Sequence, residues 1–124
     1  MNADTMLKTA TVLLFMAAAG GLLMALLRTR RTKMPDWLAM GHGFIAAAGL
    51  TLLVYVACVA GLPTLIWAAI ALFCLAGVGG VYLNLRFHTR DRPLPVAIIV
   101  GHAALAAAGL ALVTFGAFSA GAGA

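Results

Sequence analysis

The chain contains few charged residues and almost no acidic ones. Charged side chains make up 9% of its 124 residues, and only three of them are Asp or Glu. It therefore offers no pair of carboxylates for acid–base catalysis. It also has no phosphate-binding loop, no zinc motif and no Ser or Cys nucleophile beside a base. Any chemistry that it performs is expected to belong to a cofactor or a partner.

Cysteine is also scarce. The two cysteines, Cys58 and Cys74, do not form a Cys-x-x-Cys motif, so their spacing does not indicate a redox or metal-binding pair. We expect both to be free thiols, buried as small apolar side chains.

Apolar residues, in contrast, are abundant. They make up 65% of the chain, with a mean hydropathy of +1.10, whereas soluble domains are roughly half apolar. Four apolar runs, near 7–28, 36–60, 64–86 and 95–118, are long enough to cross a bilayer, which takes about 20 residues in a helix. The sequence therefore predicts an all-α integral membrane protein, a four-transmembrane-helix bundle forming a single membrane domain over residues 1–124.

One ten-residue segment occurs twice. Residues 41–50 read GHGFIAAAGL and residues 101–110 read GHAALAAAGL. The offset of sixty positions continues without a gap, pairing Gly20 with Gly80 and Pro35 with Pro95. Such a period indicates two structural units, about 1–61 and about 62–121, each a helical hairpin.

The net charge of +5 does not indicate nucleic-acid binding, because nearly all of the basic residues follow the first and third spans. Short basic loops stay in the cytoplasm. We therefore expect a multi-pass protein of the inner (plasma) membrane, with both termini outside (periplasmic) and both basic loops inside. The two hairpins are then repeats of the same orientation, related by an axis along the membrane normal.

Two histidines lie inside the predicted spans. His42 is about 9 Å beyond the start of the second helix, and the repeat places His102 at the same depth of the fourth. Ionisable side chains within a membrane are costly and normally face the bundle interior, so we expect the two imidazoles to face one another and share one ligand. We expect His88, in the second basic loop, to be solvated or to face the lipid headgroups.

Small residues surround both histidines. Helical steps of three or four lead from them to Ala46 and Gly49 on the second span and to Ala106 and Gly109 on the fourth, while Gly41 and Gly101 precede the imidazoles. A flat macrocycle held between helices requires neighbours of this size.

Haem b fits this pattern, because its iron commonly takes histidine as an axial ligand. The expected metal ligands are His42 and His102. The propionates would lie near the basic loops, where they can pair with Arg28, Arg30, Arg90, Arg92 and His88.

Two hairpins with histidines on facing helices resemble the membrane cytochromes b in architecture. The resemblance implies electron transfer, with exchange to a quinone or a partner near the cytoplasmic face. Because both histidines, His42 and His102, lie at one depth, it implies a single haem, which needs a partner to carry electrons across the membrane.

Each of these features has another interpretation. Small residues four apart pack membrane helices closely without any cofactor, and histidines can hydrogen-bond between helices. On this view the chain is a non-catalytic accessory subunit of a respiratory or photosynthetic complex, with other membrane subunits or a second copy as partners. A further alternative is that each histidine binds one chlorophyll-type pigment. Transport is not favoured, because no charged residue lies deep in a span.

Overall fold

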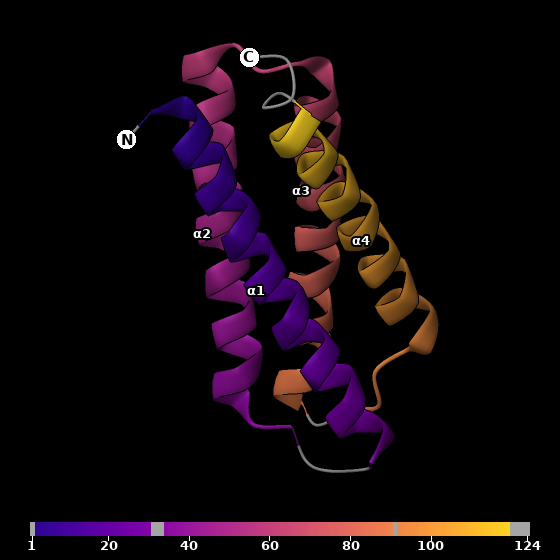
Figure 1. Ribbon diagram of the computed structural model, residues 1–124. Coiled ribbons are helices and arrows are strands. Elements are labelled where there is room, and N and C mark those ends of the chain that lie inside the picture. The colour runs from indigo at the N-terminus through magenta and orange to yellow at the C-terminus, as the bar shows by residue number, and fades with distance from the viewer. Residues whose placement is uncertain (1, 31–33, 91, 120–124) are drawn as a thin grey trace.

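Four long helices make up the computed structural model, which describes residues 2–30, 34–90 and 92–119 (Figure 1). A single 3-10 turn, η1, covers His88–Arg90, and within the described ranges there is no strand. All four helices are long and apolar enough to cross a membrane. The predicted all-α four-helix fold is confirmed. The helices are α1 (Ala3–Thr29), α2 (Asp36–Ala60), α3 (Thr64–Arg86) and α4 (Val96–Ser119).

The helix ends follow from local chemistry. The first helix begins one turn before the predicted span because the side chain of Asn2 accepts a hydrogen bond from the Thr5 amide at 2.8 Å, which satisfies a donor that the helix leaves free. The second helix ends at Ala60, and Gly61 after it has a left-handed φ of 61° and ψ of 48°, a conformation that favours glycine. Pro63 then precedes α3, so the turn is short.

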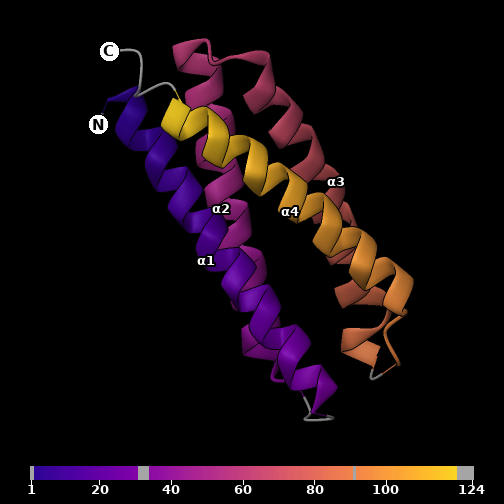
Figure 2. The same cartoon turned by 45° about the vertical axis from the view of Figure 1, so that its right-hand side comes forward.

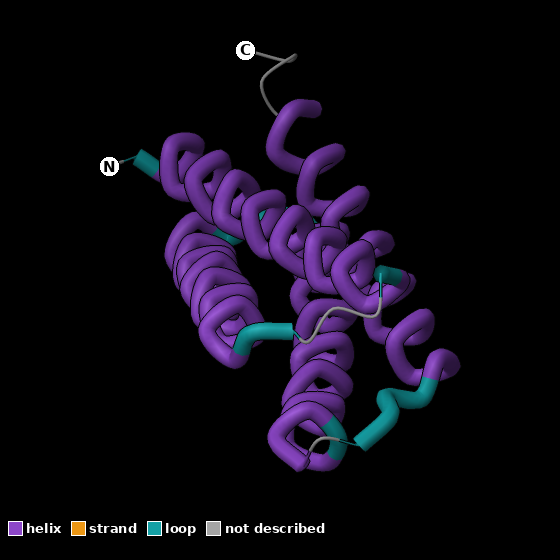
Figure 3. Tube along the Cα trace, turned by 90° about the horizontal axis from the view of Figure 1, so that it is seen from below, coloured by secondary structure: helices purple, strands orange, loops and turns teal. Residues whose placement is uncertain are grey.

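The helices alternate in direction. The start of α1, the end of α4 and the turn between α2 and α3 lie at one end of the bundle, which we call the terminal end (Figure 1). At the opposite end, here the loop end, α1 connects to α2 and α3 connects to α4 (Figure 3). Because α1 packs mainly against α2 and α3 mainly against α4, the bundle consists of two hairpins. These hairpins spread apart toward the loop end (Figure 2).

The closely packed core lies at the terminal end. It combines the first half of α1 and α3 with the second half of α2 and α4, and it includes Leu53, Val56, Ile66 and Val113, all 0% exposed. Ala10 and Ala69 allow the helices to approach one another there. This cluster does not reach the loop end, where the interior is different.

The two cysteines are free but not buried. Both Cys58 and Cys74 are exposed on the helix surface, so the expectation of buried thiols is wrong. Large apolar side chains such as Phe44 and Val78 are likewise exposed. In lipid an apolar side chain gains little from burial, because the acyl chains are as apolar as the protein interior. Hydrophobicity alone therefore does not tell which residues face inward.

Candidate functional site

His42 lies in the interface between α1 and α2. Its Nδ1 lies 2.8 Å from the carbonyl oxygen of Ala17. The ring rests against a pair of glycines on α1: a Cβ added to Gly21 would lie 3.2 Å from the imidazole Cε1, and one added to Gly20 would lie 3.7 Å from the His42 Cβ. The small residues of α1 therefore make room for the imidazole.

His102 makes the same contacts in the second hairpin. Its Nδ1 lies 2.7 Å from the carbonyl oxygen of Ala76. A Cβ added to Gly80 would lie 3.0 Å from the imidazole Cε1, and one added to Gly79 would lie 3.8 Å from the His102 Cβ. Two hairpins with different sequences thus place an imidazole in equivalent surroundings.

These contacts shift the register of the first helices by one residue. Ala76 and Gly80 of α3 occupy the places of Ala17 and Gly21 of α1, an offset of 59, whereas His102 follows His42 by 60. The gapless pairing of Gly20 with Gly80 is therefore not the structural one. The segment between Gly80 and His102 is one residue longer than the segment between Gly21 and His42.

The hydrogen bonds select the ring nitrogen that carries the proton in each neutral imidazole. A carbonyl oxygen can only accept, so Nδ1 donates in each ring. Among the described residues, Nδ1 alone has a hydrogen-bond partner in His42 and His102, so the neutral form of each ring presents Nε2 as an acceptor. A histidine whose Nδ1–H is held by a backbone carbonyl is oriented in the way that metal-binding histidines are.

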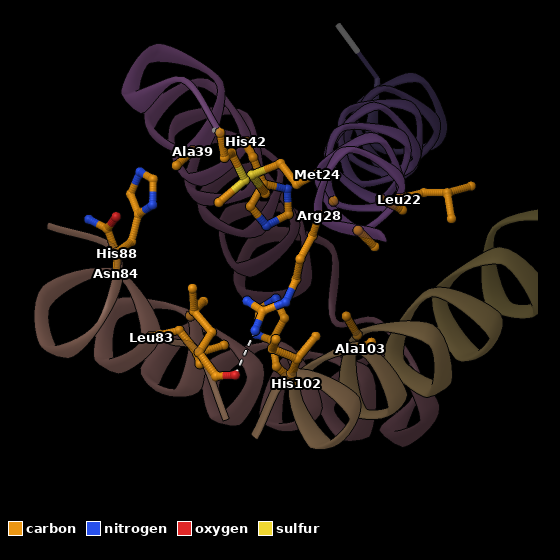
Figure 4. A pocket seen from close by; sticks show the side chains of 18 of the residues that line it. Leu22, Met24, Arg28, Ala39, His42, Leu83, Asn84, His88, His102 and Ala103 are labelled. Carbon is orange, nitrogen blue, oxygen red and sulfur yellow. Dashed lines mark hydrogen bonds between the residues drawn. The ribbon is translucent and has the colours of Figure 1, made fainter. Parts of the chain in front are cut away.

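The two rings face the same space between the hairpins. Their centroids are 6.1 Å apart and their planes are inclined by 71°. Both line a single cavity of about 410 Å³ (Figure 4). The repeat predicts that the imidazoles meet across the bundle, and the structure agrees.

The cavity has apolar walls and a polar mouth. Small residues from α1 and α4 form much of the wall, among them Ala18, Gly21, Ala103, Ala106 and Ala107. Besides the two imidazoles, its polar side chains are Arg28, Asn84 and His88, near the loop end. None of the described lining residues carries a carboxylate.

Only some of the residues predicted to surround a cofactor line the cavity. Arg28, His42, His102 and Ala106 line the cavity. Gly49 and Gly109 lie instead inside the hairpins, where an added Cβ would meet Leu14 at 3.0 Å and Phe73 at 3.1 Å, respectively. The remaining predicted residues do not line it: Ala46, Gly41, Gly101 and the exposed Arg30, Arg90 and Arg92.

His88 does not lie where the sequence suggests. Its side chain is 12% exposed and lines the cavity, with Nε2 3.0 Å from Oδ1 of Asp36. We expected this side chain to be solvated or to face the lipid headgroups. The first alternative is wrong, because the side chain of His88, at the start of η1, lines the cavity. Asn84 was missed altogether. The signal is present in the sequence, since Asn84 follows Gly80 by four residues and so continues the face of the helix that lies against His102.

Arg28 joins the two hairpins at the cavity mouth. Its Nη2 donates a hydrogen bond of 2.7 Å to the carbonyl oxygen of Leu94, marked by the dashed line in Figure 4. The side chain thus reaches from the end of α1 to the segment before α4. It is partly buried there.

The described residues contain no cluster of three or more His, Cys, Asp or Glu side chains that could hold a bare metal ion. Comparison of the chain with protein-family models, with curated proteins and with solved structures gives no match.

Proposed function

We propose that this chain is a membrane protein that holds one haem b between His42 and His102 and acts in electron transfer, alone or as a subunit. The observation that carries the proposal is the pair of imidazoles, each with Nδ1 on a backbone carbonyl, at a centroid separation of 6.1 Å across one cavity.

The separation suits one metal atom between the rings. Imidazole nitrogen binds transition metals at about 2 Å, and the ring centroid lies about 1.1 Å behind that nitrogen. Two rings that share one metal, with Nε2 facing Nε2, therefore have centroids about 6 Å apart, and the centroids of His42 and His102 are 6.1 Å apart. Because both rings already have a fixed tautomer, little reorganisation is needed for binding.

The cavity suits a macrocycle better than a bare ion. Two imidazoles alone are too few ligands for a protein-bound ion, which normally takes four or more, whereas haem supplies four nitrogens and needs only two axial ligands. The volume of about 410 Å³ falls within the range of about 300–1,000 Å³ typical of ligand pockets. The wall of alanine and glycine leaves room for a flat plate.

A bound haem would supply one-electron redox chemistry. The chain's own residues hold and orient the axial imidazoles through Ala17 and Ala76, and the apolar walls limit the access of water. The cavity lies in one half of the bundle, so exchange with a quinone or a partner protein belongs at the loop end. Passage of electrons across the whole membrane requires a further centre in a partner.

The proposal includes an orientation. The loop end carries Arg28, Arg30, Arg86, Arg90 and Arg92, and the positive-inside rule assigns such an end to the cytoplasm. Both termini then lie on the outer side of the inner membrane, and the two hairpins are parallel repeats. The equivalent surroundings of His42 and His102 support the repeat.

A structural accessory subunit is the main competing function, and one observation favours it. The Nδ1 contacts with Ala17 and Ala76 are hydrogen bonds between helices, which hold membrane helices together without any cofactor. Two chlorophyll-type pigments are less well supported. Two stacked pigment macrocycles would require the two imidazoles to be about 3.5 Å further apart than one macrocycle does. The ring centroids of His42 and His102 are 6.1 Å apart, which suits one macrocycle.

The test is the absorption spectrum of the protein purified in mild detergent, oxidised and then reduced with dithionite. We expect sharp Soret and α bands of a six-coordinate haem b, and their loss in both His42→Ala and His102→Ala. His88→Ala is the comparison variant, because it removes the third histidine but neither of the two imidazoles that would hold the iron, and it is expected to keep the positions of the bands. Circular dichroism checks that each variant remains helical.

Other outcomes have distinct meanings. A colourless, helical protein isolated with its native partners would show that the histidines are structural and would favour the accessory subunit. Absorption in the far red would favour a chlorophyll-type pigment.

A further inference from the structure

The mouth of the cavity differs in chemistry from its walls. Arg28 comes from the first hairpin, and Asn84 and His88 come from the second. All three can donate hydrogen bonds. Because none of the described lining residues is acidic, the mouth offers donors to a ligand that enters it.

Arg28 has unused donors. A guanidinium carries five N–H groups, and among the described residues Arg28 makes one hydrogen bond, from Nη2 to Leu94. That bond holds the side chain across the mouth. In Figure 4 the guanidinium overlaps the His102 side chain, and Arg28 lines the same cavity as the two imidazoles. A ligand in this cavity is therefore expected to meet Arg28.

The second hairpin provides a further set of polar groups. Nε2 of His88 is buried and has no hydrogen-bond partner, since Asp36 lies 3.0 Å away without suitable geometry. Asn84, in the last turn of α3, lies four residues before it and lines the same cavity. A buried nitrogen without a hydrogen-bond partner is unfavourable, so a ligand group that reaches Nε2 of His88 would satisfy it. The nearby carboxylate of Asp36 is 84% exposed, so water screens its charge.

We propose that the mouth binds the acidic edge of the ligand, with one carboxylate at Arg28 and a second at Asn84 and His88. This inference rests on the proposed function, because haem b is an apolar plate with two carboxylates on one edge. Of the five basic side chains that the sequence suggests as partners of the propionates, it keeps two, Arg28 and His88. The exposed Arg30, Arg90 and Arg92 lie outside the cavity.

The test compares two probes, haem b and its dimethyl ester, in which both carboxylates are methylated. Each is titrated into the full-length apoprotein in detergent, and binding is followed in the Soret band. We expect the wild-type protein to prefer haem b, and Arg28→Gln to reduce this preference by about tenfold to a hundredfold, the usual effect of a lost charge-assisted hydrogen bond. The Soret maximum should stay in place, because both imidazoles remain.

Arg30→Gln is the matched control, since it removes the same charge two residues from Arg28 but outside the cavity. It should keep the wild-type preference. Partition of the ester into detergent affects every variant equally, so it cancels when the preferences are compared. A smaller loss of preference is expected for Asn84→Leu.

The outcomes separate this inference from the proposed function. If haem b and the ester both give the six-coordinate spectrum and Arg28→Gln changes their ratio no more than Arg30→Gln does, the carboxylates do not meet the mouth, while haem binding stands. If neither probe gives that spectrum, the proposed function is wrong and this inference falls with it. Should Arg28→Gln fail to fold, equal losses with Asn84→Leu and Arg30→Gln would still overturn the inference.

Discussion

The two ends of the bundle are both apolar, yet only one of them is filled. At the terminal end, Leu53, Ile66 and Val113 are 0% exposed and pack around one another. At the loop end, Ala18, Gly21, Ala103 and Ala106 are among the residues that line a cavity of about 410 Å³. The helices of each hairpin remain in contact at both ends, so the space opens between the hairpins.

This difference shows that side-chain size, not polarity, divides the bundle. Membrane helices associate through close packing and interhelical hydrogen bonds, because lipid supplies no hydrophobic driving force between them. The terminal end can supply that packing for the whole molecule. The loop end can then contain small residues, a polar mouth and two oriented imidazoles. Substitutions at the terminal end should therefore change stability, and substitutions at the loop end should change ligand binding.

The largest expected effect is on stability, when a buried side chain of the core at the terminal end is truncated. Leu53→Ala should lower the free energy of unfolding by about 2–5 kcal/mol, the usual range for a buried leucine. Leu53 is 0% exposed, so its truncation leaves a cavity and removes the packing contacts that hold the helices together. Unfolding in mixed micelles with rising sodium dodecyl sulfate measures the change. Haem affinity of the folded protein should change by less than about threefold.

Leu23→Ala is the control for this variant, because Leu23 is exposed and should face lipid. A loss of haem affinity in Leu53→Ala as large as its loss of stability would mean that the two ends are coupled, contrary to the comparison.

The next largest effect is on haem affinity, when a larger side chain is placed in the wall of the cavity at the loop end. Ala106 lines the cavity, whereas its counterpart Ala46 does not. Ala106→Leu should therefore lower haem affinity by about a hundredfold, roughly 2.7 kcal/mol, while the protein remains helical. Ala46→Leu adds the same side chain in the other copy of the repeat. If both variants bind haem equally well, the cavity is not the binding site.

Much of the fold follows from the sequence. Apolar run length gives α2 and α3 with their observed bounds, and proline and glycine set the ends near Pro35 and Gly61. The repeat places His42 opposite His102. These features depend on one helix at a time, or on symmetry, and so a pattern in the sequence can carry them.

The sequence could not assign the small residues to their neighbours. Gly49 and Gly109 were expected beside a cofactor, but they pack against Leu14 and Phe73 within the hairpins. A helical face of small residues fits equally well against another helix or against a ligand, so periodicity cannot distinguish them. His88 was misplaced for a related reason: a loop residue has no periodicity, and its position depends on how the chain leaves α3.

The smallest expected effect concerns Gly21 and Gly80, the two glycines that contact the imidazoles and that the register shift makes equivalent. An added Cβ would lie 3.0 Å from the His102 ring at Gly80 but 3.2 Å from the His42 ring at Gly21. Both distances are short, so the ring must move by a few tenths of an ångström and its Nδ1 hydrogen bond must bend. Gly80→Ala should therefore lower haem affinity several-fold, and Gly21→Ala should lower it less, as measured by titration in the Soret band.

Gly77→Ala is the control, because a Cβ there has no neighbour within 4 Å. An alternative pairing of Gly20 with Gly80, as in the gapless repeat, would instead predict that Gly20→Ala matches Gly80→Ala, and its added Cβ lies no closer than 3.7 Å to His42. The ranking of Gly20, Gly21 and Gly80 thus tests in solution which residues of the two hairpins are equivalent.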